Sequence, residues 1–367
     1  MKVLVAMSGG VDSSVAAYLL KEQGHEVIGL SFELWDQRDT KNPNICCSLE
    51  TIQIARDVAE KLGIKHYTTD VRDSFYRDVI EEFCSLYISG VTPNPCILCN
   101  KFIKFKALLN KAAETGADLV ATGHYARIDP VPFGTGQARE PGEQSTDNKR
   151  FLLKKGVDPK KDQSYVLYVM TQEELSKTVF PLGELKKDET RNIAAKLGLA
   201  SALRPESQEI CFVGDGNYTD FVRDFAPEAL QRGPVVDTQG KVVGEHKGIA
   251  FYTIGQRKRL GIQTLKPHYV VDINRQKNMV IVGSRAEAEK KSFIVKELNW
   301  ISMDAISKPF KARAKIRSTM KEQSATLIPE ENQKVRVEFD EPQWAPTPGQ
   351  SAVFYDKDVV IGGGIIE

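Results

Sequence analysis

The sequence predicts an α/β domain with a parallel sheet, followed by a small central domain and a C-terminal β-barrel. Strand-like and helix-like segments alternate up to about Gly123, helical patterns largely end after Phe225, and short strands with turns follow from about Val270. Alternating strands and helices are typical of parallel sheets with helices on both faces. Regularly spaced short strands are typical of small barrels. We place the three domains at residues 1–200, 201–275 and 276–367.

In the first domain, apolar patterns and terminating residues justify each element. Short apolar runs predict strands at residues 3–6, 26–31, 65–69 and 119–122. Apolar residues at helical spacing, several of them followed by glycine, predict helices at residues 11–23, 49–62, 74–88, 101–115 and 187–197. Residues 130–150 are polar and contain Gly, Pro, Ser and Asp, so we expect an exposed insertion that could be disordered.

The rest of the chain carries two further local signals. Thr171 and Glu174 form a capping-box pattern, which predicts a short helix. Alternating apolar residues predict strands at residues 269–273, 279–282, 312–316, 335–339 and 351–355.

Composition excludes several classes of protein. The 367 residues are 41% hydrophobic and 27% charged, which is ordinary for a globular chain of roughly two to three domains. No apolar run approaches the ~20 residues that span a membrane. The first strand follows Met1-Lys2 directly, which leaves no room for a leader peptide. We therefore expect a cytoplasmic protein, monomeric and without a membrane partner.

Charge and cysteine content narrow the chemistry. The net charge is +1, so any nucleic-acid contact must come from a local basic patch. Six cysteines in a chain of this length argue against a disulfide framework. They are more typical of core residues, metal ligands or reactive thiols.

A glycine- and serine-rich turn, residues 8–14, lies between the first strand and the first helix. A helix N-terminus binds phosphate through its unpaired N–H groups, and glycines let the backbone wrap around an anion. Ser8, Ser13 and Ser14 add hydroxyl donors, and Asp12 could hold a magnesium ion between phosphates. The turn lacks the lysine of G-x-x-x-x-G-K-[ST] and the spacing of G-x-G-x-x-G, so it is a different phosphate site.

Gly123-His124 ends another predicted strand of the same sheet. Because ligands bind at the carboxyl ends of parallel strands, this pair and the turn can face one pocket.

A second dense motif contains two cysteines. Residues 92–101 read Thr-Pro-Asn-Pro-Cys-Ile-Leu-Cys-Asn-Lys. The prolines stiffen a turn, and Cys99 falls at the start of the helix predicted over residues 101–115. A helix N-terminus and neighbouring lysines lower the pKa of a thiol, so we expect Cys99 to be nucleophilic. Cys211, taken alone, is more typical of a buried inert thiol, and we assign no role to Cys46, Cys47 and Cys84.

Four cations recur at every second position, at Lys311, Arg313, Lys315 and Arg317. On a strand they share one face. An isolated charge run is usually a solvated face, but this alternation favours phosphate contact.

Together these motifs resemble the tRNA-uridine 2-sulfurtransferases, also called tRNA-specific 2-thiouridylases. Residues 8–13 are similar to the PP-loop, S-G-G-x-D-S, of the ATP pyrophosphatases with an adenine nucleotide α-hydrolase-like domain. The resemblance covers nearly the whole chain and leaves out only residues 130–150. Its other segments are residues 92–106, 121–125, 161–165, 210–212, 244–246, 253–257 and 347–355.

The resemblance implies specific roles. ATP would bind Ala6, Met7, Ser8, Gly9, Gly10, Val11, Asp12, Ser13, Phe32 and Gly123, with Mg²⁺ neutralising the departing pyrophosphate. The wobble uridine of tRNA for Lys, Glu or Gln would contact Asn94, Pro95 and Cys96. Other tRNA contacts would come from His124, Lys161, Asp162, Gln163, Arg317, Ser318 and Gln350. No residue is assigned as a dedicated metal ligand.

The resemblance also implies the roles of two thiols. Cys211 would carry sulfur as a persulfide received from a sulfur-relay protein or a cysteine desulfurase. Cys99 would release the product by attacking the Cys211 sulfur, or would free hydrosulfide for the attack. Either route ends in a Cys99–Cys211 disulfide that a reductant must reset.

One departure leaves an alternative open. Cys96 stands where several family members carry Asp, and a thiol is a weaker hydrogen-bond partner than a carboxylate. Cys96, Cys99 and Cys211 could instead hold a [4Fe–4S] cluster. The rival readings are a small-molecule PP-loop ligase or amidotransferase, a non-catalytic RNA-binding module, and a tRNA cytidine thiolase.

Overall fold

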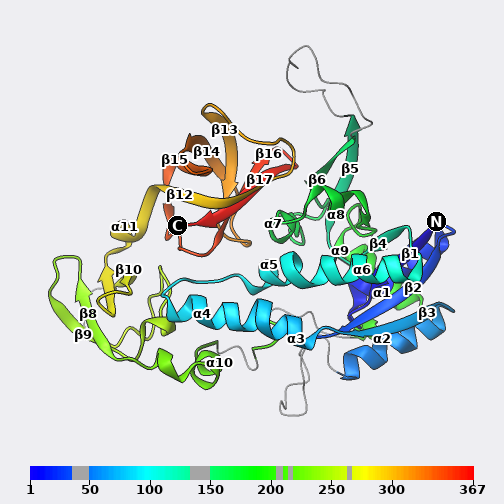
Figure 1. Ribbon diagram of the computed structural model, residues 1–367, viewed down its shortest axis with the longest axis horizontal. Helices are drawn as coiled ribbons and strands as arrows, with labels where there is room; N and C mark the ends of the chain where they lie inside the picture. The colour runs from blue at the N-terminus through cyan, green and yellow to red at the C-terminus, as the bar shows by residue number, and fades with distance from the viewer. Residues whose placement is uncertain (35–48, 133–148, 204–209, 214–217, 263–266) are drawn as a thin grey trace.

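The structure of the chain, a computed structural model, describes residues 1–34, 49–132, 149–203, 210–213, 218–262 and 267–367 (Figure 1). The barrel that holds the C-terminus lies above a layer of helices. The sheet that begins at the N-terminus lies at one end of this layer, and a small central sheet lies at the other.

The N-terminal sheet is parallel, as predicted, with the strand order β3-β2-β1-β4-β7. Its strands are β1 (Lys2–Ala6), β2 (Glu26–Glu33), β3 (Lys65–Asp70), β4 (Leu119–Ala121) and β7 (Thr178–Val179). Successive residues of β1 enter different cores: Leu4 packs into one hydrophobic cluster, and Val3 and Val5 into another. Both faces of the sheet are therefore covered.

Two helical runs form one of these covering layers. The first comprises α3 (Arg72–Phe75), a π-helical segment η1 (Tyr76–Glu81) and α4 (Glu82–Ile88), and the second comprises α5 (Pro95–Cys99), a π-helical segment η2 (Asn100–Lys104) and α6 (Phe105–Thr115). The other layer contains α1 (Val11–Glu22), α2 (Leu49–Lys61) and α9 (Lys187–Lys196).

The second helical run begins earlier than predicted, which corrects the position of Cys99. Asn94 caps the helix by accepting a hydrogen bond from the Ile97 N–H at 3.4 Å, and Pro95 takes the first helical position. Proline is favoured there because its missing N–H is not needed. Cys99 thus lies more than one turn inside the helix, and Cys96, at the second position, is the cysteine of its first turn.

The central sheet has the order β10-β11-β8-β9. Its strands are β8 (Gly233–Asp237), β9 (Val242–His246), β10 (Tyr269–Asn274) and β11 (Met279–Gly283). The short helices before and beside it are η3 (Ala200–Leu203), α10 (Tyr218–Phe225), η5 (Pro227–Ala229) and η6 (Ile249–Phe251). Strand β11 belongs to this sheet, and the domain limits at residues 200 and 275 remain predictions.

The C-terminal strands form a closed barrel of the order β12-β15-β14-β13-β16-β17, because β12 pairs with both β15 and β17. They are β12 (Glu289–Trp300), β13 (Phe310–Lys315), β14 (Gln323–Glu330), β15 (Lys334–Trp344), β16 (Ser351–Asp356) and β17 (Val359–Ile366). Short helix α11 (Arg285–Ala288) precedes them. The predicted barrel is confirmed.

A hairpin from the first domain extends the barrel sheet. Strands β5 (Ala126–Pro132) and β6 (Lys149–Lys155) pair with each other, and β6 pairs with β17. The predicted insertion at residues 130–150 is therefore partly wrong: its two ends are strand residues, because they complete this ladder, and residues 133–148 lie outside the described residues. Helices α7 (Ser164–Leu167) and α8 (Gln172–Ser176) follow, and α8 begins with the predicted capping box at Thr171.

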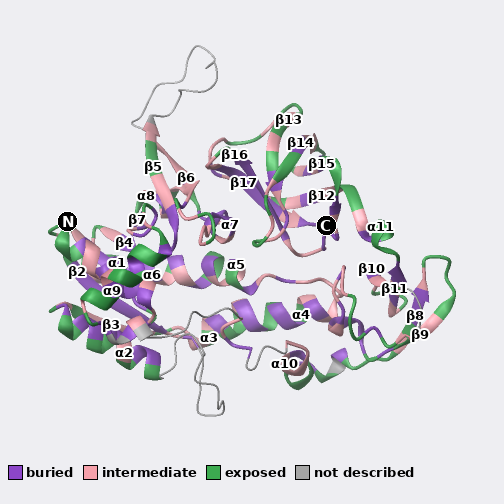
Figure 2. Cartoon of the chain, turned by 180° about the vertical axis from the view of Figure 1, so that it is seen from behind, coloured by how far each residue is buried: buried purple, intermediate pink, exposed green. Residues whose placement is uncertain are grey.

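Buried residues concentrate in the parallel sheet, the barrel and the inner faces of the helices (Figure 2). Among the described residues, no helix is both long enough and apolar enough to cross a membrane.

Candidate functional site

The predicted anion turn follows β1 at the point where the strand order reverses between β1 and β4. Such a switch point is where ligands bind in open parallel sheets. Gly9 has φ +73°, and a Cβ there would lie 2.2 Å from the Thr51 carbonyl oxygen of α2, so only glycine fits. Gly10 is the N-cap of α1 and has no side chain to satisfy the first N–H groups of the helix, which leaves them for a ligand.

Gly123 lies directly against this turn. A Cβ on Gly123 would come 2.7 Å from the Ser13 backbone nitrogen and 2.8 Å from the Asp12 carbonyl carbon. The end of β4 and the start of α1 therefore meet at one edge of the sheet. Ala6 and Phe32, at the ends of β1 and β2, pack in the same hydrophobic cluster, and Met7 and Val11 are buried beneath the turn.

The hydroxyls of Ser13 and Ser14 form hydrogen bonds with backbone groups of the turn itself. The Ser13 hydroxyl donates to the Gly10 carbonyl at 3.1 Å and accepts from the Ser8 N–H at 3.1 Å. The Ser14 hydroxyl, which is fully buried, also donates to Gly10 at 2.9 Å. The expectation that Ser14 offers a donor to the ligand is wrong, because its hydroxyl is used inside the helix. Ser8 is exposed.

Asp12 is held by two side chains from elsewhere in the chain. The Lys187 ammonium lies 2.7 and 2.8 Å from its two carboxylate oxygens, and the Tyr125 hydroxyl donates to it at 2.8 Å. In this state the carboxylate that was predicted as a magnesium ligand is paired with a lysine. Within the described ranges, no group of three or more His, Cys, Asp or Glu side chains is arranged to hold a metal ion.

Cys99 and Cys211 both pack against the hydrophobic cluster that contains Leu4 of β1. Phe212 fixes the Cys211 segment, since its buried ring makes edge-to-face contacts with Phe75 at 5.7 Å and Phe83 at 5.2 Å between centroids. The cysteines Cys96, Cys99 and Cys211 are reduced, and Cys96 is exposed. Cys46 and Cys47 lie outside the described residues, and Cys84 is buried in the core.

The first group of expected RNA contacts is linked through Tyr125. Gln163 exchanges two hydrogen bonds with the Tyr125 backbone, each 3.0 Å long. The Asp162 carboxylate accepts from the Ser164 N–H and the Ser164 hydroxyl, both at 3.0 Å, so it orders its own turn. His124 is buried against Phe105 and Phe180, bonds Thr122 at 2.7 Å, and burial holds its pKa well below the usual value. Lys161 is half-buried on the same turn.

The second group lies where the barrel touches the cysteine motif. The Gln350 amide donates to the carbonyls of Thr92 and Pro93, each at 3.0 Å, and the Thr92 N–H donates to Pro348 at 3.0 Å. These contacts hold the segment just before Asn94-Pro95-Cys96. Half-buried Arg317 donates to the Ala345 carbonyl at 2.9 Å, and burial lowers its pKa. Ser318 is exposed.

The predicted row of cations is only partly on one strand. Lys311, Arg313 and Lys315 share one face of β13, whereas Arg317 lies beyond its end. Arg313 pairs with Glu322 at 3.9 Å and Lys311 with Asp340 at 4.0 Å. Lys315 is half-buried over the Tyr165 ring at 5.8 Å, and burial lowers its pKa. Of the three cations on this face, Lys315 is therefore the one that lies near the segment with Lys161 to Gln163.

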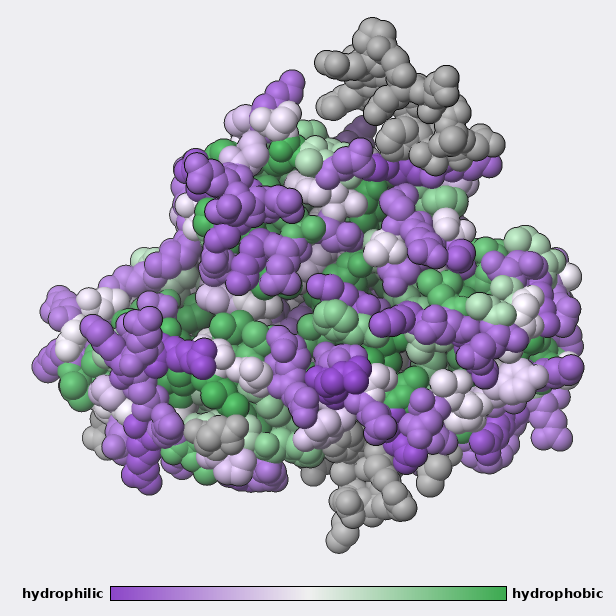
Figure 3. Space-filling view, viewed as in Figure 1, coloured by the Kyte–Doolittle hydropathy of each residue, from purple (hydrophilic) through white to green (hydrophobic). Residues whose placement is uncertain are grey.

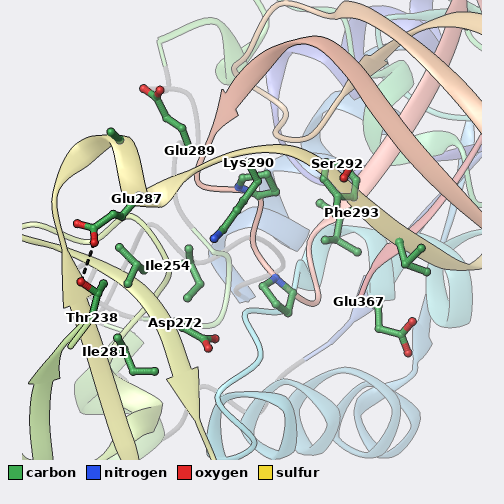
Figure 4. A pocket seen from close by; sticks show the side chains of 17 residues that line it. Thr238, Ile254, Asp272, Ile281, Glu287, Glu289, Lys290, Ser292, Phe293 and Glu367 are labelled. Atoms are coloured by element: carbon green, nitrogen blue, oxygen red, sulfur yellow. Dashed lines mark hydrogen bonds between the residues drawn. The ribbon is translucent and has the colours of Figure 1, made fainter. Parts of the chain in front are cut away.

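A separate cavity of about 810 Å³ lies between the central sheet and the barrel (Figure 4). Its lining includes Thr238, Ile254, Asp272, Lys290 and Glu367, none of which is a predicted site residue. In the face shown in Figure 3, hydrophobic residues are visible between the barrel and the helical layer, and hydrophilic residues predominate around them.

Family models match three consecutive parts of the chain: a tRNA methyl transferase HUP domain at residues 1–215, a tRNA methyl transferase PRC-barrel domain at 219–284, and an aminomethyltransferase β-barrel domain at 290–366. Curated relatives cover all of it. A protein of Caldanaerobacter subterraneus subsp. tengcongensis named tRNA-specific 2-thiouridylase MnmA 2 is 50% identical over 100% of this chain and 98% of its own length. The tRNA-specific 2-thiouridylase MnmA of Clostridioides difficile is 47% identical over 100% and 98%.

This chain belongs to the tRNA-specific 2-thiouridylase family. Members of this family are transferases, and the resemblance that the sequence motifs predicted is confirmed. Among solved structures, a 4-thiouridine synthetase–RNA complex with bound ATP covers 62% of this chain and 50% of its own at 17% identity, with a TM-score of 0.36. That likeness is weak, so the family assignment rests on the full-length relatives.

The sequence motifs did not reveal every residue at this thiouridylase-family site. Lys187 and Tyr125 contact Asp12 across 175 and 113 positions of sequence. Lys187 stands in an ordinary amphipathic helix, so no local signal connects it to the turn.

Proposed function

We propose that this chain transfers sulfur to C2 of the wobble uridine in tRNAs for Lys, Glu and Gln, with ATP as the activating substrate. One observation carries the proposal: the cluster behind the end of β1, from which the anion turn emerges, also packs against the reduced cysteines Cys99 and Cys211. A site for phosphates and a pair of sulfur nucleophiles thus share one domain.

The proposed first step activates the base. The C2 oxygen of uracil is a poor leaving group, so it attacks the α-phosphorus of ATP, pyrophosphate departs, and AMP becomes the group to be displaced. The turn at residues 8–14 and Gly123 would bind the nucleotide. Mg²⁺ would neutralise the pyrophosphate, and most of its ligands would be phosphate and water oxygens, because the nearby carboxylate of Asp12 is bonded to Lys187 through both oxygens.

The proposed second step transfers sulfur. A Cys211 persulfide, loaded by a sulfur-relay protein or a cysteine desulfurase, attacks C2 through its terminal sulfur and AMP leaves. The Cys99 thiolate then attacks the Cys211 Sγ, which breaks the sulfur–sulfur bond, frees the thiolated tRNA and forms a Cys99–Cys211 disulfide. A dithiol reductant restores both thiols. The target base, turned out of the anticodon stack, would lie against Asn94, Pro95 and Cys96.

The test is thiolation of unmodified tRNA for Glu with ATP, Mg²⁺ and a persulfide-loaded donor, read by retardation on a mercury-containing gel. We expect Cys99→Ser and Cys211→Ser each to lower the rate roughly 10³-fold or more and to leave tRNA affinity unchanged. Cys84→Ala, which removes a core thiol of the same cluster, is the matched control and should retain thiolation.

Two outcomes would contradict the proposal. Loss of tRNA binding in both serine variants would make these cysteines structural. ATP–pyrophosphate exchange driven by a small acceptor without RNA would favour a small-molecule ligase or amidotransferase. The alternative of a [4Fe–4S] cluster on Cys96, Cys99 and Cys211 is tested by iron and sulfide analysis of protein purified without oxygen; the persulfide route predicts neither.

A further inference from the structure

The ion pair between Asp12 and Lys187 lies on the anion turn itself. The Lys187 ammonium reaches both carboxylate oxygens, at 2.7 and 2.8 Å, and its side chain is 9% exposed, against 34% for Asp12. The Tyr125 hydroxyl donates to the same carboxylate at 2.8 Å. Three separated parts of the chain, α1, the residues after β4 and the start of α9, therefore meet on one charge.

The backbone fixes where Lys187 can reach. Lys187 is the first residue of α9, and its N–H donates to the Asp158 carboxylate at 3.0 Å. That bond is the main cause of the lowered pKa of Asp158. The side chain then runs past the Tyr125 ring, 5.7 Å from ammonium to centroid, and ends at Asp12.

Stability alone does not account for such a pair. Removing two charges from water costs about as much as their attraction returns, so a largely buried ion pair is weak evidence of stabilisation. Its place is more informative. Asp12 stands in the first turn of α1, where an anion would bind, and an unpaired carboxylate at that point would repel a phosphate.

We propose that Lys187 is a positioning residue of the nucleotide site, which balances the charge of Asp12 so that the turn accepts a polyphosphate. This role rests on the proposed nucleotide site at residues 8–14. Because the Lys187 ammonium neutralises the Asp12 carboxylate, that carboxylate no longer opposes phosphate binding. The N–H groups and the dipole at the start of α1 can then attract a phosphate. The ligand class is therefore a nucleoside polyphosphate, and its affinity should depend on the charge of the phosphates.

The test measures binding, which needs neither tRNA nor turnover. Affinities for ATP and for adenosine are measured by titration calorimetry, first with EDTA and then with Mg²⁺. We expect Lys187→Met, which roughly keeps the length of the side chain, to lower the affinity for ATP about tenfold or more. The affinity for adenosine should stay unchanged. Lys187→Arg should restore the ratio of the two affinities, because it restores the charge.

Asp12→Asn is an independent test of the same proposal, because it removes the carboxylate charge and keeps Lys187. Without metal it should bind ATP more tightly than the unaltered chain, because the ammonium is then free of its carboxylate. Lys154→Met is the matched control: Lys154 also pairs with carboxylates, Asp129 at 3.1 Å and Asp358 at 3.2 Å, but away from the turn. It should leave both affinities unchanged.

The possible failures are distinguishable. If the unaltered chain binds adenosine and ATP equally, or neither, the proposed nucleotide site falls together with this role. If the unaltered chain prefers ATP and Lys187→Met keeps that preference, only the role of Lys187 is overturned. If Lys187→Met does not fold, Asp12→Asn still tests the proposal. A lower affinity of Asp12→Asn for ATP without metal would overturn the role of Lys187.

Discussion

Gly123 is the residue at which the two predicted halves of the nucleotide site touch. A Cβ there would lie 2.7 Å from the Ser13 nitrogen and 2.8 Å from the Asp12 carbonyl carbon, both backbone atoms that cannot rotate away. Gly123→Ala therefore displaces the start of α1. We expect this substitution to lower the free energy of unfolding by about 1–3 kcal/mol, measured by thermal unfolding. It should also lower the affinity for ATP about tenfold or more, measured by titration calorimetry.

Gly116→Ala is the control for that substitution. Gly116 ends α6 with φ +65° and has no atom within 4 Å of a built Cβ, so alanine there adds backbone strain without a collision. A cost of about 1 kcal/mol with normal ATP affinity is expected. Equal ATP affinity in the two alanine variants would show that contact with Gly123 does not shape the site.

At the residue scale, local motifs were predictable and their partners were not. The strand–turn–helix at residues 8–14 and the glycine after β4 could be located because backbone requirements leave a signal in the sequence. Asp12 could not be matched with Lys187 or Tyr125, since a side-chain pair formed by folding leaves no such pattern. The inward hydroxyl of Ser14 was likewise invisible, because serine reads the same whether it closes a helix or faces a ligand.

At the element scale, the helix that carries Cys96 and Cys99 is anchored from outside its own sequence. Two prolines read as a stiff turn, but Pro95 is accepted as the first helical residue and Asn94 caps it. The preceding residues are held by the barrel: Gln350 donates to Thr92 and Pro93, each at 3.0 Å. The start of this helix is therefore fixed by a turn some 250 residues later in the chain.

Gln350→Leu tests whether this anchor positions the cysteines. It leaves two carbonyls without their donor, which should cost about 1–3 kcal/mol, and it frees the segment before Asn94. Without tRNA, we expect Cys96 and Cys99 to be alkylated faster in Gln350→Leu than in the unaltered chain. Mass spectrometry measures the alkylation rate. Gln343→Leu is the control. It loses one side-chain hydrogen bond to the Glu341 carbonyl within β15 and should not change the alkylation rate. An unchanged alkylation rate in Gln350→Leu would show that this anchor does not position the two cysteines.

At the scale of the whole molecule, the order of domains was predictable but their docking was not. Alternating patterns indicated the parallel sheet and the barrel because each has its own periodicity. The barrel joins the first domain through the Tyr165 hydroxyl, which donates to the Ser351 carbonyl at 2.7 Å, and through the Ser164–Tyr355 contact at 3.3 Å. The hairpin of β5 and β6 extends the barrel sheet at β17, although its segment looked like an insertion. Only the pairing with β17 identifies β6 as part of this sheet.

Acid sensitivity is a property of the whole fold, because its shielded histidines lie in separate places. Burial lowers the pKa of His66 on β3, His124 after β4 and His246 on β9. Each takes up its proton at a lower pH in the folded chain than in the unfolded chain, where a histidine titrates near pH 6.5. Their contribution is thus fully present above about pH 6.5 and is lost as the pH falls below it, and the buried His124 alone accounts for up to about 1.4 kcal/mol per pH unit.

Urea unfolding between about pH 8 and pH 5 measures this loss, and the window separates it from the carboxylates. Asp70 and Glu287 have pKa values lowered to about 2 by hydrogen bonds, so their contributions are lost only at more acidic pH, below the usual carboxylate range. We expect a plateau above pH 7 and a decline below pH 6.5, and His124→Asn should reduce the slope of that decline by up to about 1.4 kcal/mol per pH unit. A flat profile down to pH 5 would mean that these rings accept protons within the folded chain, which their burial argues against.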